Sequence, residues 1–117
     1  MHNFKNLKVC QKSANLAVKI YHVTANFPAS DKFGMTSQMR RAEVSISSKI
    51  AEGTAKSSSK SFSNSLEIRL GESCELETQM IIAEKFNLIF GETAHQLDAD
   101  ISEIQKMIIG FKSTVTT

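Results

Sequence analysis

The sequence predicts an all-α protein, an antiparallel up-down-up-down four-helix bundle, and three observations support this prediction. Apolar residues recur at intervals of three and four in four separate segments, which is the period of a helix face. The chain has one Pro and five Gly, so few positions interrupt a helix. The connections between the segments are short, as in bundles with antiparallel neighbours. We predict a single domain over residues 1–117, since this length suits one core.

The first helix is predicted over residues 6–26, and its apolar face is wider than one bundle seam needs. Phe27-Pro28 ends it, because the residue before Pro disfavours the helical region. Two apolar stripes lie about a third of a turn apart. They consist of Leu7, Cys10, Ala14, Ala17 and Tyr21, and of Val9, Leu16, Ile20, Val23 and Phe27.

A row of lysines lies on one side of this predicted helix. Its members are Lys5, Lys8, Lys12 and Lys19. A solvated surface explains any single lysine, but as a row they are candidates for contact with nucleic-acid phosphates. Arg40 in the second helix is expected on the side away from the core. It is therefore the arginine that we expect to reach solvent or phosphate.

The second helix is predicted over residues 36–53 and carries a polar stripe beside its apolar one. Thr36 or a neighbour is the expected N-cap, and Gly53 the expected left-handed C-cap. We favour bonds to other helices or another subunit over ligand contact for the polar stripe. The apolar stripe is Met35, Met39, Ala42, Ile46 and Ile50, and the polar stripe is Gln38, Arg41, Ser45, Ser48 and Glu52.

The third and fourth helices are predicted over residues 60–90 and 93–111. The third has apolar residues on two sides, so more than one neighbour should cover it. Glu75 interrupts one of its rows; we expect a half-buried carboxylate paired with Arg41. Ser59 or Ser61 is the expected N-cap. The rows are Phe62, Leu66, Ser73, Leu76 and Met80; Ile68, Glu75, Ile82 and Phe86; and, in the fourth helix, Leu97, Ile101, Ile104, Ile108 and Phe111.

The charge is distributed unevenly along the chain. Residues 1–60 hold ten Lys and Arg against three acids, whereas residues 61–117 hold four against nine. This asymmetry fits two interpretations equally well: a basic binding face, or basic and acidic helices paired side by side.

Several classes of protein are not favoured. No apolar run reaches the roughly 20 residues that span a bilayer, and no signal-peptide core is present, so we expect a cytoplasmic protein. We interpret Cys10 and Cys74 as core residues without a disulfide. His2, His22 and His95 lack metal-ligand spacing. No serine of the second helix has a base beside it, and no glycine-rich phosphate loop occurs, so we expect no cofactor and no enzymatic activity.

A dense motif follows Phe27-Pro28. It comprises Gly34, Thr36, Gln38, Arg40, Arg41, Ala42, Ser45, Ile46, Ile50, Ala51, Glu52 and Gly53. In this order the residues resemble the four-helix-bundle proteins encoded in intervening sequences of bacterial 23S rRNA genes. The accessory variability determinant of diversity-generating retroelements belongs to the same superfamily. Met35 and Met39 stand where the family has Leu. Lys49 stands where it has Asn, and should extend to the bundle edge or pair with an acid of the third helix.

The resemblance implies a ring-shaped homopentamer, with RNA or DNA and a reverse transcriptase as further possible partners. The wide apolar face of the first helix independently predicts a homo-oligomer. The predicted function is therefore a non-enzymatic, homo-oligomeric bundle with phosphate-led nucleic-acid affinity. The alternative is a scaffold that binds a protein such as a reverse transcriptase, without direct nucleic-acid contact.

Overall fold

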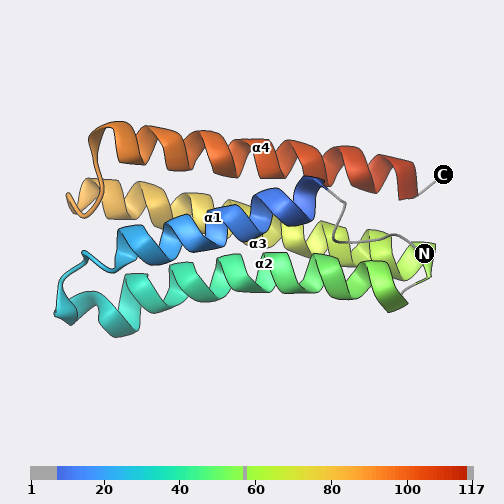
Figure 1. The fold of residues 1–117 in the computed structure, drawn as a ribbon, viewed down its shortest axis with the longest axis horizontal. Helices are drawn as coiled ribbons and strands as arrows, with labels where there is room; N and C mark the ends of the chain where they lie inside the picture. The colour runs from blue at the N-terminus through green and yellow to red at the C-terminus, as the bar shows by residue number, and fades with distance from the viewer. Residues whose placement is uncertain (1–7, 57, 116–117) are drawn as a thin grey trace.

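Four long α-helices run antiparallel along one axis in the computed structural model, which describes residues 8–56 and 58–115 (Figure 1). They are α1 (Lys8–Thr24), α2 (Ser37–Lys56), α3 (Ser59–Lys85) and α4 (Gly91–Val115). Contacts join α1 to α2, α2 to α3, α3 to α4 and α4 back to α1, which closes a bundle of 44 × 23 × 21 Å. The predicted four-helix bundle is confirmed.

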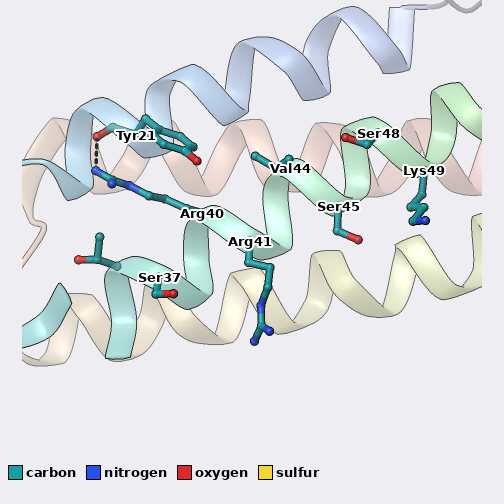
Figure 2. A pocket seen from close by; sticks show the side chains of 9 residues that line it. Tyr21, Ser37, Arg40, Arg41, Val44, Ser45, Ser48 and Lys49 are labelled. Atoms are coloured by element: carbon teal, nitrogen blue, oxygen red, sulfur yellow. Dashed lines mark hydrogen bonds between the residues drawn. The ribbon is translucent and has the colours of Figure 1, made fainter. Parts of the chain in front are cut away.

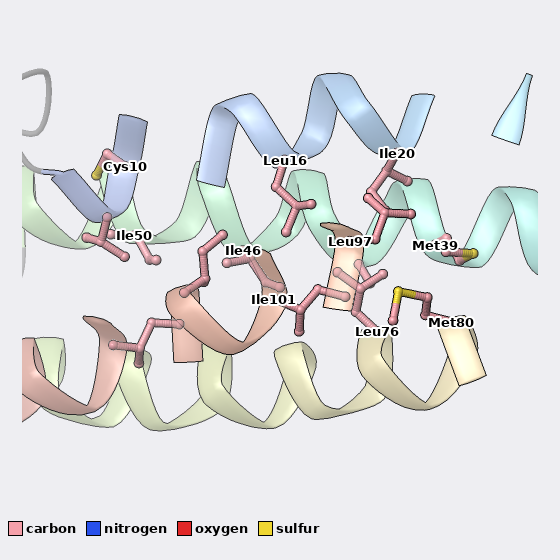
Figure 3. Close-up of a cluster of buried hydrophobic side chains, with 14 of the residues drawn as sticks. Cys10, Leu16, Ile20, Met39, Ile46, Ile50, Leu76, Met80, Leu97 and Ile101 are labelled. Atoms are coloured by element: carbon pink, nitrogen blue, oxygen red, sulfur yellow. The ribbon is translucent and has the colours of Figure 1, made fainter. Parts of the chain in front are cut away.

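The core is a continuous column of aliphatic side chains between the helices. Figure 3 shows these side chains pointing inward from all four helices. The spacing of three and four predicted the α4 contribution, because Leu97, Ile101, Ile104 and Ile108 are all buried. Near the end of the column Phe62 packs edge-to-face on Phe111, with ring centroids 5.1 Å apart.

The connection from α1 to α2 is itself helical in part. A 3-10 turn (Ala29–Asp31) and a π turn (Lys32–Thr36) lead directly into α2. Thr36 is buried at the end of the π turn. Pro28 follows the end of α1 as predicted.

Gly53 does not end α2, contrary to our expectation of a left-handed cap. The helix continues to Lys56, and the positive-φ glycine of the described chain is Gly91. A Cβ on Gly53 would lie 2.7 Å from Cδ1 of Phe62. Glycine is therefore needed here for the close approach of α2 to α3.

Both boundaries of α3 differ from the prediction. Ser58 is the N-cap, and its Oγ accepts a hydrogen bond from the Ser61 amide at 3.2 Å. At the other end the helix stops at Lys85, because Asn87 adopts φ +60°. The Leu88 amide then donates to the Ala83 carbonyl at 2.9 Å, which is a Schellman ending. The predicted helix extended to Phe90 because the apolar pattern does, and it does so since Ile89, in the turn after the helix, packs into the core.

Candidate assembly and nucleic-acid surfaces

Acids of α4 pair with part of the predicted lysine row. The Lys12 Nζ lies 3.2 Å from Glu103 Oε1, and the Lys19 Nζ lies 2.7 Å from Asp100 Oδ2. Lys8 is exposed at the start of α1, and Lys5 lies outside the described residues. The paired lysines are half-exposed, so each ion pair contributes only about 0–1 kcal/mol. The basic and acidic halves of the chain are thus paired, but these ion pairs are weak enough for another anion to replace the carboxylates.

Arg40 is turned toward α1 and is half-buried, which corrects our expectation that it would face solvent. Its guanidinium carbon lies 4.4 Å from the centre of the Tyr21 ring. Its Nε donates to Thr24 Oγ1 at 2.8 Å, and its Nη2 donates to the Tyr21 carbonyl at 3.2 Å. Arg40 therefore joins α1 to α2. Arg41, one position on, is exposed and points away from Tyr21 (Figure 2).

The polar stripe of α2 bonds partly to α3, as predicted. The Ser45 hydroxyl donates to Glu72 Oε2 at 2.8 Å, and Glu72 also lies 2.6 Å from the Arg69 Nε. Gln38 accepts from the Gln79 amide at 3.4 Å. Ser48 is exposed beside them.

The predicted pair between Arg41 and Glu75 is absent from the part of the chain that the structure describes. Glu75 is exposed rather than half-buried, and among the described residues it accepts from the Gln79 amide alone, at 3.3 Å. Its position on the outer side of α3 explains the error, because the row to which it belongs faces away from the core. Arg41 and Glu75 are consequently two exposed charges on neighbouring helices.

Lys49 adopts the first of the two arrangements predicted for it, because its ammonium extends to the surface. It is exposed, and its Nζ lies 3.5 Å from Glu52 of the same helix rather than near an acid of α3. Such a pair at i, i+3 contributes a few tenths of a kcal/mol.

We expect Lys49→Asn to change the free energy of unfolding by less than about 0.5 kcal/mol, because neither the pair nor the site is buried. Chemical denaturation of both proteins at the same concentration measures the difference. A loss above about 2 kcal/mol would show that Lys49 has a buried partner in the assembled protein.

A shallow groove of about 570 Å³ runs between α1 and α2. Figure 2 shows the side chains around it. Tyr21 and Val44 give it an exposed apolar floor, 47% and 40% accessible. Three cations and several hydroxyls line the remainder, and none of the described lining residues is acidic. The lining residues are Tyr21, Thr36, Ser37, Arg40, Arg41, Val44, Ser45, Ser48 and Lys49.

Glu43, which the sequence pattern did not single out, is a polar residue fully buried in α2. Neither carboxylate oxygen has a hydrogen-bond partner within the described chain. Burial raises the pKa of Glu43 to about 8. The nearby Ser47 hydroxyl, which donates to the Glu43 backbone carbonyl at 3.1 Å rather than to the carboxylate, lowers it in part, and the charge of Glu72 raises it further. The side chain is therefore a neutral acid at pH 7. The spacing of Met39, Glu43, Ile46 and Ile50, at four, three and four, was the signal that could have located it.

The structure also places the two cysteines and the residue types that bind metals. Cys10 is buried, and burial raises its pKa, whereas Cys74 is exposed, contrary to our core assignment; both are free thiols. No group of three His, Cys, Asp or Glu in this part could hold a metal ion. Within residues 8–56 and 58–115, no helix has the length and apolarity that crossing a membrane requires.

Comparison with known proteins decides the family. Over residues 5–110 the sequence matches the model of the 23S rRNA-intervening sequence protein family. The chain belongs to this family. The motif from Gly34 to Gly53 that suggested the family therefore lies within the matched region, and in the structure it forms the end of the π turn and most of α2.

A solved structure supports the assignment to the intervening-sequence family. It is the crystal structure of a protein of unknown function from the S23 ribosomal protein family of Bacteroides thetaiotaomicron VPI-5482. The two chains are 29% identical and superpose with a TM-score of 0.82, over 90% of this chain and 95% of that one. No curated protein matches this chain at a significant level.

Proposed function

We propose that this intervening-sequence family protein is a non-enzymatic scaffold that works as a homo-oligomer, with five subunits as the resemblance implies. One observation carries the proposal: large apolar side chains are exposed on two different faces. Tyr21 and Val44 lie on the α1/α2 face, and Val18 is exposed on α1 toward α4. Ile68 and Phe86, which are 58% and 72% accessible, lie on the outer side of α3 with Ile82. Large apolar side chains exposed in such numbers usually mark an interface between proteins.

Light scattering during size-exclusion chromatography tests the assembly. At micromolar concentration the protein is expected to elute at a multiple of its 12.9 kDa chain mass, with five as the favoured multiple. Since hydrophobic contacts dominate the proposed interface, the mass should persist in about 0.5 M salt, where surface ion pairs are screened. A monomer mass would overturn the proposal.

A second function, phosphate-led binding of RNA or DNA, is favoured by the lysine row on α1. Lys8, Lys12 and Lys19 are all exposed, and the carboxylates that pair with two of them are held in water-screened contacts. Phosphates can therefore replace these acids. In a homo-oligomer the row repeats in every subunit, so a net charge of only +2 per chain still produces a basic belt. Such binding would be weakly selective and strongly salt-dependent.

Fluorescence anisotropy with a structured RNA and a duplex DNA over a salt series measures this affinity. The variant Lys8→Glu/Lys12→Glu/Lys19→Glu should bind more weakly and with a shallower salt slope, provided that its oligomer mass is unchanged. The matched variant Asp100→Asn/Glu103→Gln removes the competing acids and should bind more tightly. Absence of binding by the natural protein at low salt would reject this function. The protein-binding alternative, for example to a reverse transcriptase, would then be the one to pursue.

A further inference from the structure

Two surfaces of the same chain carry complementary apolar and charged side chains. The first is the α1/α2 groove described above. The second, which we call the α3 stripe, consists of Ile68, Glu75 and Ile82. We infer that the groove of one subunit takes the α3 stripe of a second copy, in a head-to-tail contact. This inference rests on the proposed self-assembly and names the surfaces that would produce it.

The groove has the chemistry of a receptor for an apolar helix bearing an acid. Tyr21 and Val44 offer apolar contact area on its floor. Arg41 stands at its edge as an exposed cation without an ion pair among residues 8–56 and 58–115. Two carboxylates touch the rim of the groove, Glu72 at Ser45 and Glu52 at Lys49, but no acid occurs among its described lining residues. Arg41 is therefore the cation there that can take a carboxylate from another chain.

The α3 stripe has the matching chemistry. Its members are spaced by seven residues, so they share one face of the helix. Ile68 and Ile82 are exposed on either side of Glu75, which is also exposed and, within the described part of the chain, has the Gln79 amide as its sole partner. An apolar-acid-apolar row of this kind fits a groove with an apolar floor and a cation at its edge.

The two surfaces also have similar lengths. From Ile68 to Ile82 the α3 stripe extends over 14 residues, about 21 Å at the rise of an α-helix. Along α2 the groove extends from Ser37 to Lys49, about 18 Å on the same basis. Phe86, exposed one turn beyond Ile82, prolongs the α3 stripe by a further apolar side chain.

The occupant that these observations favour is another copy of this chain, because the chain carries both complementary surfaces in exposed form. The contact uses a different surface on each partner, so every bound subunit keeps one free groove or one free stripe. Repetition then closes a ring or extends a filament. In this arrangement Arg41 of one subunit pairs with Glu75 of the next, which gives both exposed charges a partner.

Charge reversal tests the contact. Arg41→Glu and Glu75→Lys should each dissociate the oligomer, with the midpoint of dissociation moved at least tenfold upward in protein concentration by light scattering. Mixing the two single variants should raise the mass again, because the reversed groove of one accepts the reversed stripe of the other. The restored assemblies should be open or even-numbered, since a closed ring of five alternating variants would keep one like-charge contact. Glu67→Lys makes the same charge change one position before the α3 stripe, about 100° around the helix, and should leave the mass unchanged.

The possible outcomes distinguish a failure of this contact from a failure of the proposed self-assembly. A monomeric natural protein would overturn self-assembly itself. An oligomeric natural protein whose mass is unaffected by either single variant would overturn only the contact. Single variants that dissociate and stay dissociated after mixing would also overturn the contact. Such a result would indicate that Arg41 and Glu75 pair within one chain, because a second chain cannot restore a pair of that kind. Circular dichroism of each variant confirms that the helices are intact.

Discussion

Replacement of Glu43 by Gln is expected to stabilise the protein by about 3 kcal/mol at pH 7, although it adds no contact. Glu43 is fully buried and has a pKa of about 8, against an ordinary value of 4.5. At pH 7 the unfolded chain has lost this proton and the folded chain has kept it. Each pH unit between the unfolded pKa of 4.5 and pH 7 corresponds to about 1.4 kcal/mol, so folding at pH 7 costs about 3 kcal/mol through this one group. Glutamine has nearly the same shape and no such cost.

The pH dependence gives the sharper form of the same prediction. Because the folded pKa lies above the unfolded one, the contribution of Glu43 to stability is greatest below pH 4.5. It falls as the pH rises toward 8 and then levels off. The stability difference between Glu43→Gln and the natural protein should therefore grow from about pH 5 to pH 8.

Urea denaturation at several pH values, at one protein concentration, measures this difference. Glu67→Gln, a change of the same kind at an exposed site, serves as the control and should show no comparable growth. A constant difference across this range would show that Glu43 is solvated or paired in the protein.

Gly53→Ala is expected to destabilise the protein by about 2 kcal/mol, the reverse of the usual effect inside a helix. Alanine normally favours a helix over glycine by about 1 kcal/mol. At this site the new Cβ would meet Cδ1 and Cε1 of Phe62 at 2.7 and 2.9 Å. Phe62 is buried against Phe111, so its ring cannot move without disturbing the end of the core. Overpacking of this kind costs about 1–3 kcal/mol.

Two glycines provide matched controls for this test. Gly71 and Gly110 also lie inside helices, and a Cβ on either would meet nothing within 4 Å. Their alanine variants should therefore gain up to about 1 kcal/mol. Thermal or urea denaturation of the three variants decides the matter. A gain at Gly53 equal to the gain at the controls would contradict the close approach of α2 and α3.

The sequence by itself determined the number and order of the helices and most of the core. Periodicity was sufficient because an apolar stripe at intervals of three and four can be buried only on one side of a helix. Leu97, Ile101, Ile104 and Ile108 were found in this way. The motif in residues 34–53 was also sufficient to indicate the family, which the match over residues 5–110 then established.

Only the tertiary structure decided how far each helix is rotated about its own axis. Neighbouring residues on a helix differ by 100°, so a small rotation exchanges the roles of two adjacent side chains. This is why Arg40 rather than Arg41 is held against α1, and why Glu43 is buried together with Ala42. The role of Gly53 was also decided by tertiary structure. It lies inside a helix, and the position of Phe62 on another helix explains why a glycine is needed there. Such facts depend on contacts between segments, which the local pattern of residues does not contain.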